Sequence, residues 1–196
     1  NCNAGDDSCT NAYQQDRVDV LKSYADYSWG LDPDHYVIFE HLGGSNEEQQ
    51  WANYRLNEGK GIMLWGKTNT PYYQLIMGYG SDSNFSAIGH ESRGFEGKRL
   101  LGYFESHDEE RVMYKALQFG NDWDGYNIQE LNTALSRMSA IGAMSLTIPG
   151  PKMIWHFSDL GMENSLFTCY DGSVNEPDCK LDTKPQPQWA DNWLSN

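Results

Sequence analysis

Hydrophobic residues follow two alternating patterns along this chain. Short runs of consecutive apolar residues, rich in β-branched and aromatic side chains, are typical of buried strands. Such runs lie at 35–39, 61–66, 99–104 and 152–157. Between and around these runs, apolar residues recur at helical spacing. This second pattern predicts helices at 16–29, 45–57, 72–79, 109–119 and 128–146.

The alternation of strands and helices predicts a parallel sheet that is covered by helices. The polar segments at 1–15, 80–98 and from 158 onward predict loops. In parallel α/β sheets, ligands bind where the strands end. Polar residues that directly follow a predicted strand are therefore the first candidates for a functional site.

The overall charge narrows the function classes. The chain has 28 acidic and 14 Lys or Arg side chains, and its formal net charge is −14. This charge repels nucleic-acid phosphates and anionic lipid headgroups, which argues against nucleic acids and membranes as partners. No apolar run approaches the about 18 residues that a membrane-spanning helix needs. Aromatic residues make up 13% of the chain; they suit a core or a surface that stacks on a sugar ring.

The four cysteines fall into two close pairs, Cys2 with Cys9 and Cys169 with Cys179. Four cysteines allow three connectivities, and the local one is the simplest because each bridge would then close one polar loop. A metal site is the weaker interpretation, since neither pair has metal-ligand spacing. Four unrelated thiols remain an alternative. Bridged cysteines would place the protein in an oxidising compartment, either secreted or periplasmic.

Two polar clusters follow predicted strands, Glu40 with His41 after 35–39 and His107 with Asp108 after 99–104. Glycosidic bond cleavage needs a protonated carboxyl group for the leaving oxygen and an ionised one that faces the developing positive charge. A single Glu, or a single His-Asp pair, is more often a solvated or structural feature. Both clusters at matching ends of strands in one sheet favour a functional site.

Three segments resemble the α-amylase family, glycoside hydrolase family 13, and most closely its secreted members from Bacteroidetes-type bacteria. They are 36–42, 102–111 and 148–155. The resemblance implies that Glu40 is the general acid/base and that Asp108 is the carboxylate that stabilises the transition state. It also implies that His107 binds the same sugar and that Arg111 orients this group. Most family members have Asn where Ser106 stands.

The resemblance implies that residues 1–196 are the C-terminal half of a TIM-type (β/α)₈ barrel, with strands five to eight and their helices. The family's nucleophile, an Asp in a Gly-x-Arg-x-Asp segment on the fourth strand, has no counterpart in this chain. Asp19 in Arg17-Val18-Asp19 imitates it, but the helical pattern predicts an ordinary surface carboxylate. We therefore expect both ends to be cut ends, the rest of the barrel to be a partner, and the family's Ca²⁺ ligands to lie mostly outside this chain.

The function expected from the resemblance is retaining hydrolysis of internal α-1,4-glucosidic bonds in starch or related α-glucans by a secreted enzyme, with the chain by itself inactive. Transglycosylases and α-glucosidases share these motifs. The alternative is a catalytically incomplete module that binds α-glucan or serves a structural role. Other acidic pairs, Glu47-Glu48 and Glu109-Glu110, are interpreted as charges at helix N-termini. Residues 122–125 are interpreted as a solvated loop.

Overall fold

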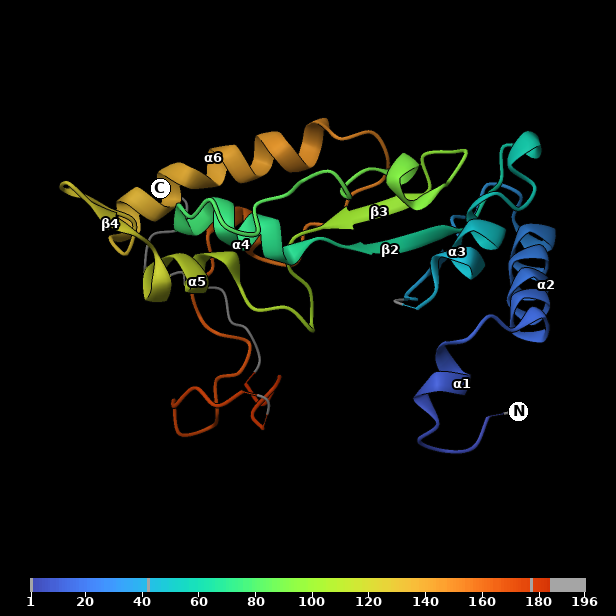
Figure 1. Cartoon of the computed structure of the whole chain (residues 1–196), viewed down its shortest axis with the longest axis horizontal. Helices are drawn as coiled ribbons and strands as arrows, with labels where there is room; N and C mark the ends of the chain where they lie inside the picture. The colour runs from blue at the N-terminus through green and yellow to red at the C-terminus, as the bar shows by residue number, and fades with distance from the viewer. Residues whose placement is uncertain (1, 42, 177, 184–196) are drawn as a thin grey trace. The chain divides into compact units, whose positions relative to one another are not determined.

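The computed structural model describes residues 2–41, 43–176 and 178–183 (Figure 1). The chain forms two compact units. The first comprises Asn1–Lys67, Ser86–Gly102 and Ile148–Lys152, and the second comprises Thr68–Phe85, Tyr103–Thr147 and Met153–Asn196. Among the described residues, no helix combines the length and the apolar character that crossing a membrane requires. The polar segment expected from 158 onward is described only to residue 183, apart from residue 177.

The first unit contains the parallel sheet. Its elements are α1 (Asp7–Asn11), α2 (Gln15–Leu31), β1 (Ile38–Phe39), α3 (Ser45–Ala52), η1 (Leu56–Glu58), β2 (Met63–Lys67), η2 (His90–Arg93) and β3 (Leu100–Tyr103), of which Tyr103 counts with the second unit. The three strands are parallel and lie in the order β1-β2-β3. Ile38 pairs with Met63, and the Leu64 amide donates to the Arg99 carbonyl at 2.9 Å. The expected parallel pairing is therefore confirmed for these strands.

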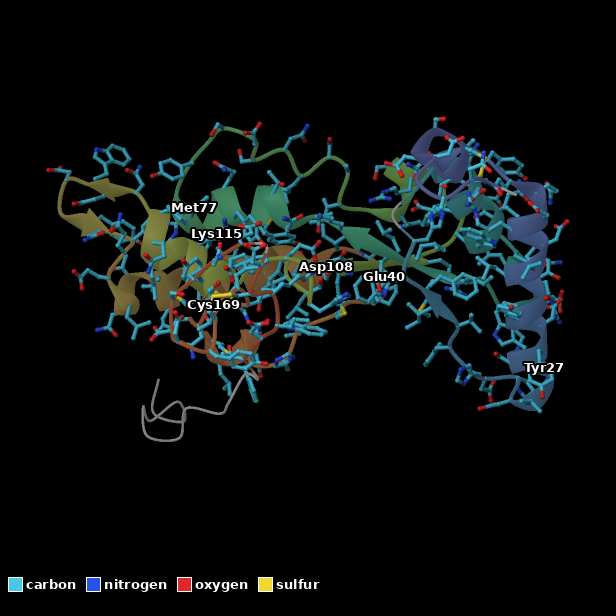
Figure 2. The ribbon with its side chains drawn as sticks, turned by 90° about the horizontal axis from the view of Figure 1, so that it is seen from below. Tyr27, Glu40, Met77, Asp108, Lys115 and Cys169 are labelled. Carbon is cyan, nitrogen blue, oxygen red and sulfur yellow. A yellow bond between two sulfur atoms is a disulfide. The ribbon has the colours of Figure 1, made fainter. Side chains whose placement is uncertain are left out.

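The core of this unit lies between α2, α3 and the sheet. Its buried members are Val18, Ala25, Trp29, Val37, Trp51, Ala52, Ile62, Leu64, Phe95 and Leu100. The α2 members are seven and four residues apart, which places them on one face of the helix. The opposite face of α2 is also rich in apolar residues, but these are exposed: Val20, Tyr24, Tyr27 and Leu31 (Tyr27 is labelled in Figure 2).

The prediction of a strand at 152–157 is wrong beyond its first residue. Lys152 makes an isolated parallel bridge with Gly102, whose amide donates to the Pro151 carbonyl at 3.1 Å. Pro151 itself has no N–H to give to a sheet. The chain then turns, because Phe157 adopts a left-handed conformation with φ 65° and Ser158 donates its amide to the Trp155 carbonyl at 3.0 Å.

The second unit is mainly helical. It contains α4 (Asn69–Met77), α5 (Val112–Phe119), β4 (Asp122–Trp123), β5 (Tyr126–Asn127), α6 (Leu131–Thr147) and η3 (Ser158–Leu160). Helices α4, α5 and α6 pack against one another (Figure 1). Helix α4 ends at Gly78, which has φ 80°, and a Cβ there would lie 2.5 Å from the Ile128 side chain. Glycine adopts this left-handed conformation without strain and leaves room for Ile128, so it suits the C-cap of the helix.

Several expected loops contain regular structure, including η2 within 80–98 and η3 from 158, and the local cysteine pairing is confirmed. Asp6 accepts the Cys9 amide at 3.0 Å and caps the short helix α1 within residues 1–15. Residues 122–127 form the β4-β5 hairpin rather than a solvated loop. Disulfides join Cys2 to Cys9 and Cys169 to Cys179, the second drawn beside the label Cys169 in Figure 2.

Candidate functional site

Glu40 is the predicted site residue that belongs to the first unit. It follows β1 directly and its side chain is exposed. The sequence therefore placed it correctly at the end of a strand. The next residue, His41, is half-buried and connects this strand end to the helix α3. Leu42, the last residue of the resembling segment, lies outside the described residues.

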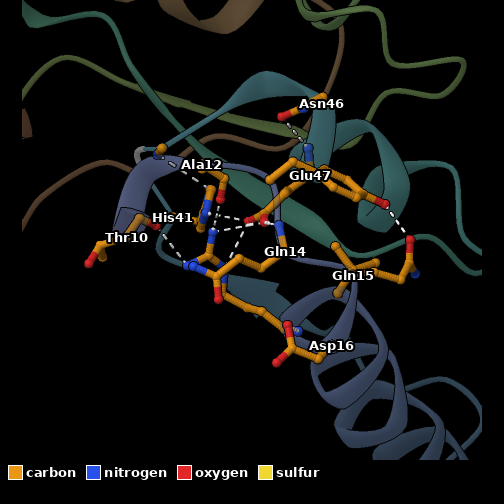
Figure 3. Close-up of polar contacts among 12 residues, drawn as sticks. Thr10, Ala12, Gln14, Gln15, Asp16, His41, Asn46 and Glu47 are labelled. Atoms are coloured by element: carbon orange, nitrogen blue, oxygen red, sulfur yellow. Dashed lines mark hydrogen bonds and ion pairs between the residues drawn. The ribbon is translucent and has the colours of Figure 1, made fainter. Parts of the chain in front are cut away.

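His41 contacts two buried carboxylates of α3, Glu47 and Glu48, and Figure 3 shows it beside Glu47. Its Nε2 is 3.3 Å from Glu47 Oε2, and its Nδ1 is 3.4 Å from Glu48 Oε1. The two Glu residues are 1% and 0% exposed. The Trp51 ring packs edge-on against the imidazole, with centroids 4.8 Å apart. The loop after β1 is thus held on α3 by one aromatic contact and two polar contacts.

Two arginines balance the charge of these carboxylates. Arg17 makes two hydrogen bonds with Glu47, through Nε at 2.9 Å and Nη2 at 2.8 Å. Arg93 Nη1 donates to Glu48 at 3.0 Å. The Gln14 amide adds a further hydrogen bond to Glu47 at 2.6 Å. These partners offset the cost of burying the two carboxylates, which would be high for either carboxylate without them.

This cluster was missed in the sequence. Glu47 and Glu48 do lie in the first turn of α3, as expected. The helical pattern held a further signal, because positions 47 and 48 are each four residues before the buried Trp51 and Ala52 and so share their face. A carboxylate on a buried face needs hydrogen-bond or charged partners. The interpretation of Glu47 and Glu48 as simple charges at a helix N-terminus did not predict such partners.

His107, Asp108 and Arg111 belong to the second unit. His107 Nε2 lies 3.4 Å from Asp108 Oδ1, and both side chains are about one-third exposed, at 34% and 36%. Lys180 forms an ion pair with Asp108. The Asp108 amide donates to Ser106 Oγ at 3.1 Å, which fixes the turn that presents the carboxylate. The pair is therefore accessible, and a cation partly neutralises its carboxylate.

Arg111 is buried, and its partners are Glu105 and His156. Its Nη1 donates to Glu105 Oε1 at 3.0 Å and to the His156 carbonyl at 2.7 Å, and its Nη2 lies 3.3 Å from His156 Nε2. Its role in orienting the His107–Asp108 pair stays a prediction. The positive guanidinium and desolvation both act on His156: desolvation lowers the pKa of this imidazole, and Arg111 lowers it further.

Glu105 is another buried residue of this unit, and the sequence did not single it out. It accepts hydrogen bonds from Arg111, from Ser158 Oγ and from the Val112 amide at 2.7 Å. Val112 is the first residue of α5, so the carboxylate also satisfies a free N–H at that helix end. Burial raises the pKa of Glu105, while Arg111 and the other donors oppose this rise.

Glu109 and Glu110 correct a second interpretation. Both precede α5 instead of forming its first turn, and both are buried, at 4% and 6% exposure. Glu110 accepts hydrogen bonds from Ser165 Oγ and from the Leu166 amide, the latter at 3.1 Å. These contacts attach the segment after η3 to the turn that carries Asp108.

No protein-family model matches this chain, and no curated protein matches it either. The family resemblance of the three segments therefore stays a hypothesis that rests on their residues. Within either unit taken by itself, the described residues bring no three His, Asp, Glu or Cys ligand atoms to one point. The Ca²⁺ expectation concerns ligands that lie mostly outside this chain, and it also stays a prediction.

Asp19 lies on the exposed surface of α2, where it accepts a hydrogen bond from Gln15 Nε2 at 2.8 Å. Its interpretation as an ordinary helix-surface carboxylate is confirmed. The other two residues of the Arg17-Val18-Asp19 segment have structural roles. Val18 is a core residue of α2, and Arg17 is the partner of Glu47.

Proposed function

We propose that this chain is part of a secreted retaining glycoside hydrolase of the α-amylase type, which cleaves internal α-1,4-glucosidic bonds of starch or related α-glucans. The observation that supports it most is the placement of the motifs on strands. Glu40 directly follows β1, and the His107–Asp108 segment follows β3, of one parallel sheet. This is the chain order in which the family's acid/base and stabilising carboxylate occur.

The proposed fold is the part of a (β/α)₈ barrel that contains strands five to eight. The parallel strands β1, β2 and β3 lie in chain order, and helices α3 and α4 are the intervening connections. The parallel bridge between Gly102 and Lys152 lies where the proposed barrel would have its next strand. The two disulfides fit the oxidising compartment of a secreted protein.

In the proposed mechanism, Glu40 protonates the leaving oxygen and then activates water, and its exposure leaves it open to substrate and solvent. Asp108 accepts hydrogen bonds from the hydroxyl groups of the distorted sugar, together with His107. Because Lys180 pairs with Asp108 in the free protein, the sugar must replace this ammonium group. The nucleophile is supplied by the rest of the proposed barrel, since no Gly-x-Arg-x-Asp segment occurs in this chain.

The test is Glu40→Gln in the full-length protein that contains this chain. Loss of general acid/base catalysis is expected to lower the rate of starch hydrolysis about 10²- to 10⁴-fold. Asp19→Asn is the matched control, because Asp19 is an exposed carboxylate of the same unit, and it should hydrolyse starch at the parent rate. Near-normal hydrolysis by Glu40→Gln would refute the assignment of Glu40.

A further inference from the structure

The β4-β5 hairpin of the second unit presents two aromatic rings to solvent. Trp123 and Tyr126 are directly paired across the hairpin and are 76% and 49% exposed. Residues directly opposite in an antiparallel pair project from the same face. The turn is Asp124-Gly125, with φ values of 48° and 82°, and this sequence and geometry give a tight two-residue hairpin. Two large rings are thus held in place by a short, well-defined support.

These rings line a cavity of about 500 Å³. Tyr79 and Phe85 contribute two more aromatic side chains, and Gln74 and Asn121 contribute amides. This volume lies in the range of about 300–1,000 Å³ that small-molecule and cofactor sites occupy. None of the residues that line it is Glu40, His107, Asp108 or Arg111. The proposed catalytic chemistry therefore does not account for it.

The walls of the cavity are tied to the helices behind it. Tyr79 Oη donates to the Phe119 carbonyl at 3.0 Å, and the backbone N–H of Asn121 donates to the Met77 carbonyl at 2.9 Å. Arg137 Nε donates to the Ile76 carbonyl at 2.8 Å, at the C-terminal end of α4. The Phe85 ring packs edge-on against the buried Tyr72, with centroids 5.2 Å apart. A ligand would therefore meet a site that needs little ordering on binding.

The chemistry of the cavity fits a neutral polyhydroxyl ligand. Exposed aromatic faces provide flat apolar contact, and the amides both donate and accept hydrogen bonds, as a sugar ring requires. Arg137 is the cationic residue that lines the cavity, and its guanidinium already donates to the Ile76 and Leu75 carbonyls. Asp122 and Asp124 of the hairpin add negative charge nearby in the sequence. With a net charge of −14 for the chain, an anionic ligand is disfavoured.

We propose that this cavity is a second, non-catalytic binding site for a neutral glycan chain. The choice of an α-glucan as that glycan rests on the proposed function. The site would hold the polysaccharide on the enzyme while the catalytic residues act elsewhere on it. Trp123 is the main contact, because its ring is 76% exposed, against 49% for Tyr126 and 41% for Tyr79.

The test measures binding and hydrolysis separately in the full-length protein. Binding of maltoheptaose, an α-glucan, and of cellohexaose, a β-glucan, is followed by titration calorimetry. Trp123→Ala is expected to weaken maltoheptaose binding at this site about tenfold, the effect of a central aromatic contact. Tyr126→Ala is the second variant. Tyr170→Ala is the matched control, since Tyr170 is 84% exposed in the same unit and does not line this cavity.

The outcomes separate this inference from the proposed function. Hydrolysis of a short chromogenic maltoside should be the same in Trp123→Ala and in the parent. If the parent hydrolyses α-glucans but neither Trp123→Ala nor Tyr126→Ala weakens binding, the cavity is not a glycan site and the proposed function is unaffected. If the parent shows no hydrolysis of α-glucans, and Trp123→Ala still weakens binding, then the cavity is a glycan site and the proposed hydrolase function is wrong. Equal losses in Tyr170→Ala, or binding of neither sugar, would overturn the inference.

Discussion

Replacing Arg111 with methionine would remove the guanidinium that faces Glu105 inside the second unit. Both side chains are almost fully buried, at 3% and 2% exposure, so solvent cannot compensate for the loss. Removing one partner of such a pair costs about 3–5 kcal/mol, because it leaves an uncompensated buried charge. The His156 carbonyl also loses its donor at 2.7 Å. We expect Arg111→Met to lower the free energy of unfolding by about 3–5 kcal/mol at neutral pH.

The second variant, Arg111→Met with Glu105→Gln, isolates the charge. The neutral amide removes the uncompensated carboxylate, so the double variant should recover about half of the lost stability. The remainder reflects the His156 carbonyl and the altered hydrogen bonds to Val112 and Ser158. Denaturation by guanidinium chloride, followed by circular dichroism, measures all three proteins.

The pH dependence gives an independent check. Burial raises the pKa of Glu105 above its ordinary value of 4.5, and removal of Arg111 raises this pKa further. The folded single variant then binds a proton that the unfolded chain releases, so its stability is highest at acid pH and is lost as pH rises through the folded-state pKa. The deficit of Arg111→Met should therefore shrink as pH falls toward 4.5. A single variant within about 1 kcal/mol of the parent, or one that gains nothing from Glu105→Gln, would refute the reasoning.

Two further predictions concern the residues beside the proposed carboxylates. His41→Ala removes the imidazole that contacts Glu47 and Glu48, and it should destabilise the protein by about 1–2 kcal/mol in thermal or chemical denaturation. His35 is an exposed histidine of the same unit, so His35→Ala should leave the stability unchanged. Equal effects of the two variants would contradict the assigned contacts. Lys180→Met removes the cation that pairs with Asp108, a contact at a one-third exposed position, and should change stability by less than about 1 kcal/mol. The same variant should lower KM for maltoheptaose about two- to fivefold, because the sugar no longer has to replace the ammonium group; a raised KM would show that Lys180 assists binding instead.

The sequence predicted those parts of the fold that local patterns determine. The apolar periodicity located α2, α4, α5 and α6, and the apolar runs located β2 and β3. The close spacing of each cysteine pair led to the correct disulfides. The run at 152–157 had the composition of a strand, but the pairing ends after Lys152 and the chain turns at the left-handed Phe157. Composition alone does not carry this information, because it depends on backbone conformation.

The buried polar groups show where the prediction of the site stopped. Glu40 and Asp108 were identified because they follow predicted strands, and both lie in turns or loops after β1 and β3. The contacts of Glu47 and Glu105 were not predicted, because their partners are distant in sequence, Arg17 for Glu47 and Ser158 for Glu105. A charged residue gives no local sign that a partner 30 or 53 residues away will neutralise or bind it.

The most direct test of the proposed function is the stereochemistry and rate of maltoheptaose hydrolysis by the full-length protein. Proton NMR of the first products distinguishes the two anomers before they equilibrate. A retaining enzyme with Glu40 as acid/base should release the α-anomer first, and Glu40→Gln should slow this release about 10²- to 10⁴-fold while Asp19→Asn does not. Release of the β-anomer first, or no cleavage of the α-1,4 bonds by the parent protein, would contradict the account.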